Sequence, residues 1–342
     1  MAARSRSPRF RKYPVAPYQK AALESLKPPE NITVSEWAEK YRVLDSKSSA
    51  MPGPWRNDKT PYLAGIMDEL CNYETEEIIF VKPSQVGGTE ALLNMLGWAI
   101  QQDPSPTMCV YPSDVLAESL VVNRFRPMIY AAPTLRRRYR ESESSKSELQ
   151  FDGMYLSMVG SNSPSQLASK AIRFLFLDEV DKYPGASKKE ADPISLAKER
   201  TKTFHNRKIF MTSTPTLKTG HIWKAMEGAD VVKHYFVPCP HCGKFIELKW
   251  KQVKFPDEGM GYSERAELAA YICQECGAII TDQHKPQMLR YGEWRVVEER
   301  AKPARRVAYW INTLYSPFVR FSEMAKAFLT SKDDPDAFQN FT

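Results

Sequence analysis

The stretch from Lys82 to Thr89, which reads K-P-S-Q-V-G-G-T, has the residue types of a phosphate-binding loop. It follows the apolar run 78–81, which is long enough for a strand buried on both faces. Helically spaced apolar residues follow the loop as far as Ile100. In a loop between a strand and a helix, backbone N–H groups and the helix N-terminus face an anion. The hydroxyl of Thr89 would meet a Mg²⁺ ion bound to that anion.

The lysine of this loop stands at an unusual position. When Gly87 and Thr89 are aligned to the pattern G-x-x-x-x-G-K-[ST], Gly88 occupies the lysine position and Lys82 that of the first glycine. A lysine is a flexible point charge and reaches a phosphate from either anchor. Taken alone, the stretch also fits an ordinary strand–turn–helix junction that binds nothing.

A pair of adjacent carboxylates, Asp178 and Glu179, follows a second apolar run at 174–177. In a nucleotide-hydrolysing parallel sheet, one carboxylate at a strand end holds the Mg²⁺ shell and the next polarises the attacking water. Acidic residues also end strands as solvated caps. Their position downstream of a phosphate loop favours the catalytic interpretation, in which Lys82, Asp178 and Glu179 act together in ATP hydrolysis.

Hydroxyl-bearing residues follow a third apolar run at 209–211, where Thr212, Ser213 and Thr214 precede Pro215. Hydroxyls at this point of a sheet sense the γ-phosphate and pass the change to neighbouring segments. The same sequence is also a common turn. We predict Ser213, Thr214 and Pro215 as the residues that couple hydrolysis to movement.

In this order, the loop with its early lysine, the D-E-V-D sequence at 178–181 and Ser213-Thr214-Pro215 resemble the large subunit of a tailed-phage terminase of the lambda type. The resemblance extends from about residue 52 to the last residue. It implies an ATP-driven motor that pumps double-stranded DNA into a procapsid, and a C-terminal endonuclease in the longer protein. It also implies the terminase small subunit, the procapsid portal and further copies in a ring as partners, no membrane, and the host cytoplasm as the compartment.

The expected fold is a three-layer α/β sandwich of the P-loop NTPase class (ASCE type) with a mainly parallel sheet. Strands are expected at 78–81, 107–111, 174–177 and 209–211. We expect a helix from 112 to 130, with Leu116, Leu120 and Phe125 on one face, and another across 188–204. The candidate ATP and Mg²⁺ contacts are Lys82, Pro83, Ser84, Gln85, Val86, Gly87, Gly88, Thr89 and Asp178.

Gln85 departs from the family pattern, because many relatives carry at this position an arginine thought to act on the γ-phosphate. The missing charge must then come from elsewhere in the same subunit or from a neighbour. Arg200 and Arg207 are the candidates for this arginine finger, with Arg124 and Arg126 behind them.

Two aromatic residues, Trp55 and Tyr62, precede the first core strand. In nucleotide motors of this build, the corresponding segment often packs on the adenine. Trp55 and Tyr62 would then stack on the base; alternatively, both attach the helix that begins near Pro61 to the sheet. The sequence does not separate these two interpretations.

Two C-x-x-C pairs, each followed by a glycine, predict a metal site: Cys239 with Cys242, and Cys273 with Cys276. Two such pairs complete a tetrahedral Zn²⁺ site, and full thiolate coordination leaves no open position, so the ion would be structural. The trailing glycines let the backbone turn sharply. The insert, about 237–280, resembles a zinc ribbon.

The chain has 342 residues with 48 Lys and Arg against 41 Asp and Glu, a net charge of +7 that fits a polyanionic partner without proving one. It contains neither an apolar run long enough to span a membrane nor a secretory signal. We divide it into a basic arm and short helix (1–50), an ATPase core (51–236), the zinc-binding insert (237–280) and a remainder (281–342). The remainder leads towards a nuclease that these residues have no room to encode, so we expect only the ATPase portion.

Two other functions stay open. A helicase-like, nucleic-acid-stimulated ATPase would share the fold, although such enzymes usually keep the standard lysine and carry a second motor domain. A zinc-containing DNA-binding module with a vestigial nucleotide site would explain why Gly88 replaces the lysine.

Overall fold

The computed structural model describes residue 16, residues 30–46, residue 49, and residues 51–185, 192–256 and 259–332. The chain divides into two compact units, Met1–Asn31 and Ile32–Thr342, and the described fold is that of the second. The predicted basic arm lies almost entirely outside the described residues.

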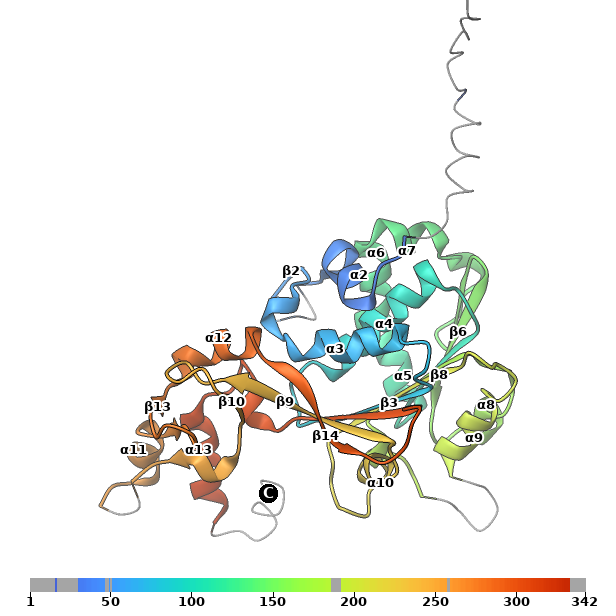
Figure 1. Ribbon diagram of the computed structural model, residues 1–342. Helices are drawn as coiled ribbons and strands as arrows, with labels where there is room; N and C mark the ends of the chain where they lie inside the picture. Colours follow the sequence, from blue (N-terminus) through green and yellow to red (C-terminus); the bar gives the residue numbers. More distant parts are fainter. Residues whose placement is uncertain are drawn as a thin grey trace, which may run out of the picture. The chain divides into compact units, whose positions relative to one another are not determined.

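A ten-stranded sheet forms the centre of the described part of the chain (Figure 1). Seven neighbouring strands are parallel to one another: β9, β15, β3, β8, β7, β4 and β6. The other three, β10, β14 and β5, pair with the edges of this set in the antiparallel direction. In spatial order they are β10 (Phe245–Glu247), β9 (Val231–Pro238), β15 (Arg306–Trp310), β3 (Glu77–Val81), β8 (Lys208–Ser213), β7 (Phe174–Asp178), β4 (Thr107–Tyr111), β6 (Met154–Gly160) and β5 (Glu148–Phe151), with β14 (Glu293–Glu299) beside β9.

The order of the strands decides which loops meet. β8 lies between β3 and β7, with Val81 opposite Ser213 and Asp178 opposite Thr212. Because parallel strands end at the same edge, the segments that follow β3, β8 and β7 are neighbours there. The predicted strands and the three-layer α/β fold with a mainly parallel sheet are confirmed.

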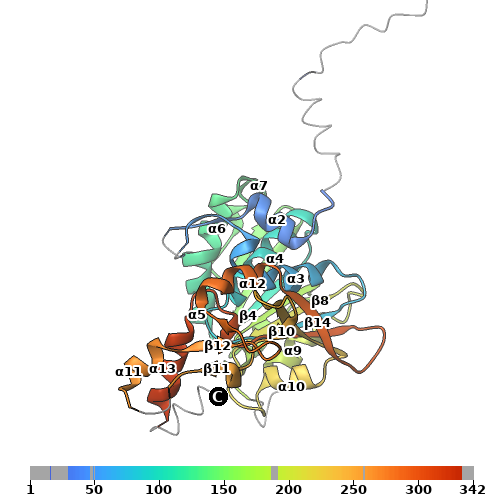
Figure 2. The ribbon, with the colours of Figure 1, turned by 60° about the vertical axis from the view of Figure 1, so that its left-hand side comes forward.

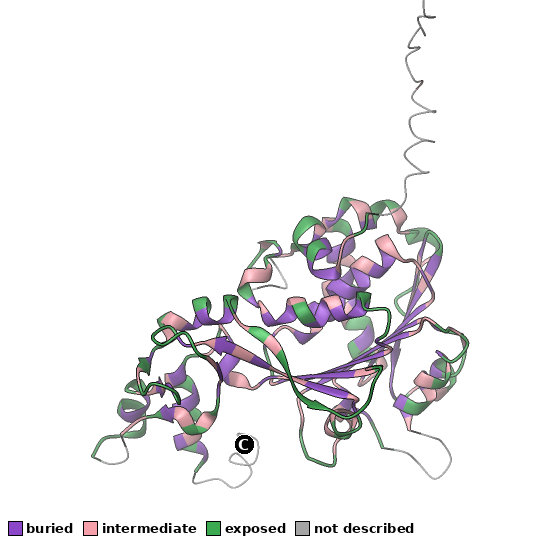
Figure 3. Cartoon of the chain, in the orientation of Figure 1, coloured by how far each residue is buried: buried purple, intermediate pink, exposed green. Residues whose placement is uncertain are grey.

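Helices cover both faces of the sheet (Figure 2). Ile78 and Phe80 face one apolar cluster and Ile79 and Val81 the other, which explains the uninterrupted apolar runs of the strands. Figure 3 shows that the middle strands are buried whereas β14 is largely exposed. The first cluster packs under α2 (Val34–Tyr41), α3 (Tyr62–Asp68), α4 (Gly88–Gln102), α5 (Asp114–Leu120), α6 (Arg126–Ala131) and α7 (Pro133–Arg138), and the second against α8 (Pro164–Leu167), α9 (Pro193–Glu199) and α10 (His221–Glu227).

The helix expected across 112–130 has a different buried face. A π-helical turn, Val121–Phe125, joins α5 to α6, and the buried residues are spaced by four, as in Ala117, Val121 and Phe125. Leu116, predicted to face inwards, is 40 % exposed. The prediction was wrong there because a π turn holds more residues than an α turn, so a spacing of four stays on one side.

The helix expected across 188–204 is also shorter than predicted. α9 begins at Pro193 because Asp192 caps it, with its carboxylate accepting the N–H of Ser195, and it ends at Glu199. Residues 188–191 lie outside the described residues, and 200–207 form turns that lead to β8.

A smaller part of the fold contains the cysteines. β9 runs from the central sheet directly into Cys239, and a second sheet is formed by β11 (Val253–Lys254), β12 (Ala270–Ile272) and β13 (Ile279–Ile280). The last described helix, α13 (Phe321–Ser331), packs on α11 (Tyr262–Glu267) through Leu329. The remainder of the chain is therefore shared between the two parts, since β15 belongs to the central sheet.

The other elements are α12 (Lys285–Arg290) and the short pair β1 (Val43–Leu44) and β2 (Gly53–Pro54). None of the described helices has the length and apolar character needed to cross a membrane.

Candidate functional site

Lys82 lies at the end of β3 and crosses the start of α4. Its side chain is almost fully buried, and its Nζ lies 2.9 Å from Oε1 of Glu179. Its backbone N–H donates to the carbonyl of Ser213 on β8, at 3.2 Å. A Cβ atom built on Gly88 would lie only 2.3 Å from Cε of Lys82. A residue with a side chain at 88 and Lys82 in this position therefore exclude each other, which accounts for glycine at the usual lysine position.

The loop between β3 and α4 has a backbone shaped for an anion. Gln85 and Gly87 have left-handed φ angles of 61° and 86°, and Gly87 precedes the first turn of the 15-residue helix α4. Such turns direct successive N–H groups to one side, where the helix N-terminus adds a partial positive charge. The hydroxyl of Tyr62, at the start of α3, donates to the carbonyl of Val86 at 3.1 Å and so attaches the loop to α3.

Asp178 and Thr89 face each other across this edge of the sheet. The Thr89 hydroxyl donates to Oδ2 of Asp178 at 3.0 Å, whereas Oδ1 of Asp178 has no hydrogen-bond partner. Asp178 is 3 % exposed, and burial, opposed by the charge of Lys82, raises the pKa of its carboxyl to about 6. An unpartnered buried carboxylate oxygen beside a hydroxyl is a pair of oxygen ligands suited to a hard cation.

Glu179 has a strained backbone and a half-buried carboxylate. Its φ is +55°, which is unusual for a residue other than glycine. In this backbone conformation the Glu179 side chain points towards Lys82. Burial alone would raise the pKa of Glu179, but the charge and hydrogen bond of Lys82, together with Lys182 at 3.2 Å, hold the pKa below its usual range. Glu179 is therefore a carboxylate at neutral pH.

The predicted coupling segment contacts both halves of the site. Besides receiving the Lys82 N–H, Ser213 accepts the N–H of Asp181 at its Oγ, at 3.2 Å. The Asp181 carboxylate in turn accepts the N–H groups of Thr216 at 3.0 Å and Ile222 at 2.8 Å. Asp181 was not among the predicted site residues, although it stands two positions after Glu179. Its carboxylate contacts a loop 35 residues further along the chain, and no local sequence pattern reveals such a contact.

The candidate arginines are separated by the structure. Arg207 pairs with Glu76 at 2.6 Å, just before β3, and Arg200 donates to the carbonyl of Ala168. Both lie at the amino ends of the strands, opposite the edge where Lys82 ends β3. This placement contradicts a role of either arginine at the phosphate loop of its own chain; a contribution to a neighbouring copy stays a prediction.

Arg124, named behind them, does contact the start of α4. Its guanidinium lies 3.1 Å from the carboxylate of Glu90, the residue after Thr89, and Arg42 binds the same carboxylate at 2.9 Å. Arg126 instead donates to the carbonyl of Ser145.

Trp55 and Tyr62 are both buried. Trp55 is 7 % exposed and donates to Asn57, and the Tyr62 ring packs edge-on against Tyr235 with centroids 6.1 Å apart. Rings enclosed in this way have no free face for a base. The geometry favours the packing role over adenine stacking.

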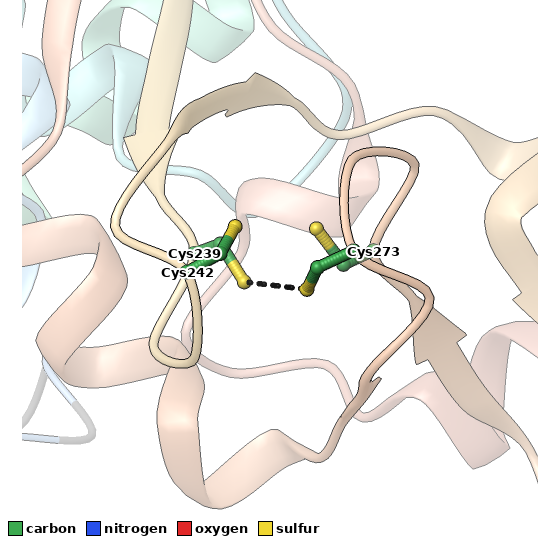
Figure 4. A group of neighbouring side chains, drawn as sticks. Cys239, Cys242 and Cys273 are labelled. Atoms are coloured by element: carbon green, nitrogen blue, oxygen red, sulfur yellow. Dashed lines mark hydrogen bonds between the residues drawn. The ribbon is translucent and has the colours of Figure 1, made fainter.

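The two cysteine pairs come together in one cluster (Figure 4). The four Sγ atoms of Cys239, Cys242, Cys273 and Cys276 lie within 4.8 Å of one another. The two pairs lie in separate turns of the same geometry. In each turn the N–H of the glycine donates to the carbonyl of the first cysteine, at 2.9 Å for Gly243 and 3.0 Å for Gly277. Both glycines have a φ of +72°, which glycine adopts without strain.

A family profile described as "Phage terminase large subunit gpA, ATPase domain" matches residues 49–294. The chain belongs to this family. The matched range contains the phosphate loop, both acidic residues of the site and all four clustered cysteines.

Two terminase large subunits are similar to this terminase chain along nearly all of its length. That of Enterobacteria phage P21 is 25 % identical over 341 residues, covering 93 % of this chain and 53 % of the P21 protein. That of Escherichia phage lambda is 23 % identical over 350 residues, covering 95 % and 54 %. The chain thus spans about half the length of these relatives. Among solved structures, the large terminase of bacteriophage HK97 is similar over 57 % of this chain and 41 % of its own, with 14 % identity and a TM-score of 0.48.

Proposed function

We propose that this chain is the ATPase portion of a DNA-packaging motor, which hydrolyses ATP to move double-stranded DNA into a procapsid. The observation that carries the proposal is the convergence of Lys82, Thr89, Asp178 and Glu179 at one edge of the sheet. In the longer protein an endonuclease would cut concatemeric DNA. The terminase small subunit, the portal and further copies in a ring are the proposed partners, in the host cytoplasm.

In this proposal the loop N–H groups and Lys82 bind the triphosphate, and Thr89 and Asp178 would hold Mg²⁺. The hydroxyl of Thr89 and the unpartnered Oδ1 of Asp178 suit an ion that prefers oxygen ligands. When bound, Mg²⁺ neutralises charge on the β- and γ-phosphates.

The ion pair of Lys82 with Glu179 gives the site two states. Without nucleotide, the pair balances two charges in a partly buried position. The phosphates of ATP compete for the Lys82 ammonium, which frees the Glu179 carboxylate. Glu179 then accepts a hydrogen bond from the attacking water and orients it towards the γ-phosphate. The reaction transfers the γ-phosphoryl group to water and yields ADP and inorganic phosphate.

The segment Ser213-Thr214-Pro215 transmits this change through Asp181. A shift of the turn that contains Glu179 moves the Asp181 N–H, which is bonded to Ser213, and the Asp181 carboxylate, which holds Thr216 and the start of α10. Asp181→Asn is expected to keep basal ATP hydrolysis but to lose its stimulation by duplex DNA. Equal stimulation of the variant and the wild type would contradict this route.

We also propose a structural Zn²⁺ in the cysteine cluster. Four thiolates at Zn–S distances of about 2.3 Å in a tetrahedron lie about 3.8 Å apart. The clustered Sγ atoms, with Cys239 and Cys276 at 3.9 Å, fit such a set. Because all four positions are thiolates, the ion would join the two turns without taking part in hydrolysis.

The proposal is tested by measuring ATP turnover with and without duplex DNA for the wild type, Lys82→Ala and Glu179→Gln. Both variants should lose activity by about 100-fold or more. Exposed residues far from the site provide matched controls, Lys326→Ala on α13 and Glu267→Gln on α11, and both should hydrolyse ATP like the wild type. A wild-type chain without turnover supports the vestigial-site alternative, and stimulation by single-stranded DNA alone supports the helicase-like one.

A further inference from the structure

Tyr111, the last residue of β4, lies beside Asp178 at the candidate nucleotide site. β4 and β7 are parallel neighbours with Val110 opposite Leu177, so the next residues, Tyr111 and Asp178, stand side by side. Residues two apart on a strand face the same side. Tyr111 and Phe176 both belong to the apolar cluster under α4, so Asp178 faces that side as well.

The Tyr111 hydroxyl is buried and has no hydrogen-bond partner. The residue is 1 % exposed, which leaves the hydroxyl no access to bulk water. A buried hydroxyl without a partner destabilises the folded state, so such groups are uncommon. The other tyrosines classed as buried in the described part of the chain all have partners for their hydroxyls; they are Tyr62, Tyr183, Tyr235, Tyr271, Tyr309 and Tyr315.

Asp178, the residue beside Tyr111 on the neighbouring strand, carries a second oxygen without a partner. Oδ1 of Asp178 accepts no hydrogen bond, while Oδ2 is used by Thr89. Protein-bound Mg²⁺ keeps several of its waters, and each water needs acceptors around it. Burial, with the neighbouring Cys109 and Asp178, holds the pKa of Tyr111 well above its usual value. The neutral phenol can therefore both accept a hydrogen bond from a water and donate one.

We propose that the Tyr111 hydroxyl is a positioning group, which holds a water of the Mg²⁺ shell beside Asp178 when nucleotide is bound. The inference rests on the proposed ATPase function and adds a residue that the loop and acid motifs do not contain. When nucleotide and Mg²⁺ are bound, this water is the hydrogen-bond partner that the Tyr111 hydroxyl otherwise lacks. The hydroxyl therefore destabilises only the nucleotide-free state.

The test compares Tyr111→Phe with Tyr139→Phe. The Tyr139 hydroxyl also lacks a partner, but its ring packs against Tyr130 and Phe151 by β5, which lies at the end of the sheet. Each variant removes one such hydroxyl, so each should unfold about 2 °C higher than the wild type without ligand. Only Tyr111→Phe should raise the Mg²⁺ concentration for half-maximal binding of a fluorescent ADP, by about tenfold. Its binding of the same probe in EDTA should stay unchanged.

Tyr111→Phe with a half-maximal Mg²⁺ concentration within about twofold of wild type overturns the inference. So does equal weakening of ADP binding with and without Mg²⁺, since that marks a purely structural role. A wild-type chain that binds no ADP even with Mg²⁺ overturns the proposed function instead. If Tyr111→Phe does not fold, wild-type protein labelled with ¹³C at tyrosine Cζ decides: Mn²⁺ with ADP must broaden the resonance of a buried tyrosine, and unchanged resonances overturn the inference.

Discussion

Asp178→Asn is expected to stabilise the protein at pH 8 when nucleotide and divalent ions are absent. Burial, opposed by Lys82, raises the pKa of Asp178 from its usual 3.8 to about 6. The folded state therefore binds this proton more tightly than the unfolded state. The free energy of unfolding falls as the pH rises from about 4 to about 6 and stays low above that. A shift of about 2 pKa units corresponds to about 3 kcal/mol, which asparagine avoids because it carries no charge.

Urea unfolding of the wild type and Asp178→Asn in EDTA at pH 8, 6 and 4 measures this effect. The advantage of the variant should be at most about 3 kcal/mol at pH 8 and about 0.5 kcal/mol at pH 4, where the folded state keeps the proton and the aspartate of the unfolded state is only about half ionised. The amide N–H₂ of asparagine lowers the difference by a similar amount at every pH, so the change with pH is decisive. A difference that stays constant from pH 8 to pH 4 would refute the reasoning.

Three further outcomes follow from the site and the cysteine cluster. Gly88→Ala should weaken ATP binding by about 100-fold, because a Cβ 2.3 Å from Cε displaces Lys82 and its charge-assisted hydrogen bonds; calorimetry checks this, with Gly185→Ala, where a Cβ meets nothing within 4 Å, as the control. Tyr62→Phe leaves the Val86 carbonyl without its donor and should lower the free energy of unfolding by about 1–2 kcal/mol and weaken ATP binding; equal affinity in the same calorimetry would count against the loop-fixing role. A zinc chelator should speed hydrogen exchange across 237–280 while nucleotide binding survives, and a parallel loss of nucleotide binding would show that the insert supports the core.

The features that the sequence predicted well are local. An apolar run followed at once by Asp178 and Glu179, or by a glycine turn and Thr89, fixes both a strand and the side chains at its end. The cysteine spacing identified the pairs for the same reason. The order of the strands was not predictable in this way, because the position of β8 between β3 and β7 depends on pairings between residues far apart in the chain.

The arginine candidates show where sequence proximity misled. Arg207 lies only six residues before Ser213, yet the two residues lie at opposite ends of β8. In a parallel sheet each crossover returns the chain to the amino edge, so a residue just before a strand is remote from a site at the carboxyl edge. For Tyr62 the sequence left base stacking and packing of the helix on the sheet equally open. The burial of its ring favours packing, and its hydroxyl, which neither interpretation considered, donates to the carbonyl of Val86.

Anchoring the ammonium on β3 has a mechanical consequence. Lys82 is joined to the central sheet by its chain connection and by its N–H bond to Ser213, whereas Thr89 belongs to the first turn of α4. In the pattern G-x-x-x-x-G-K-[ST], the lysine and the hydroxyl residue both belong to the start of the same helix. The distance between them is therefore kept when that helix moves. In this chain a tilt of α4 alone alters the gap between ammonium and hydroxyl. In the proposed ATPase, a movement of α4 alone would therefore be enough to weaken the binding of ADP after hydrolysis, with no rearrangement of the strands.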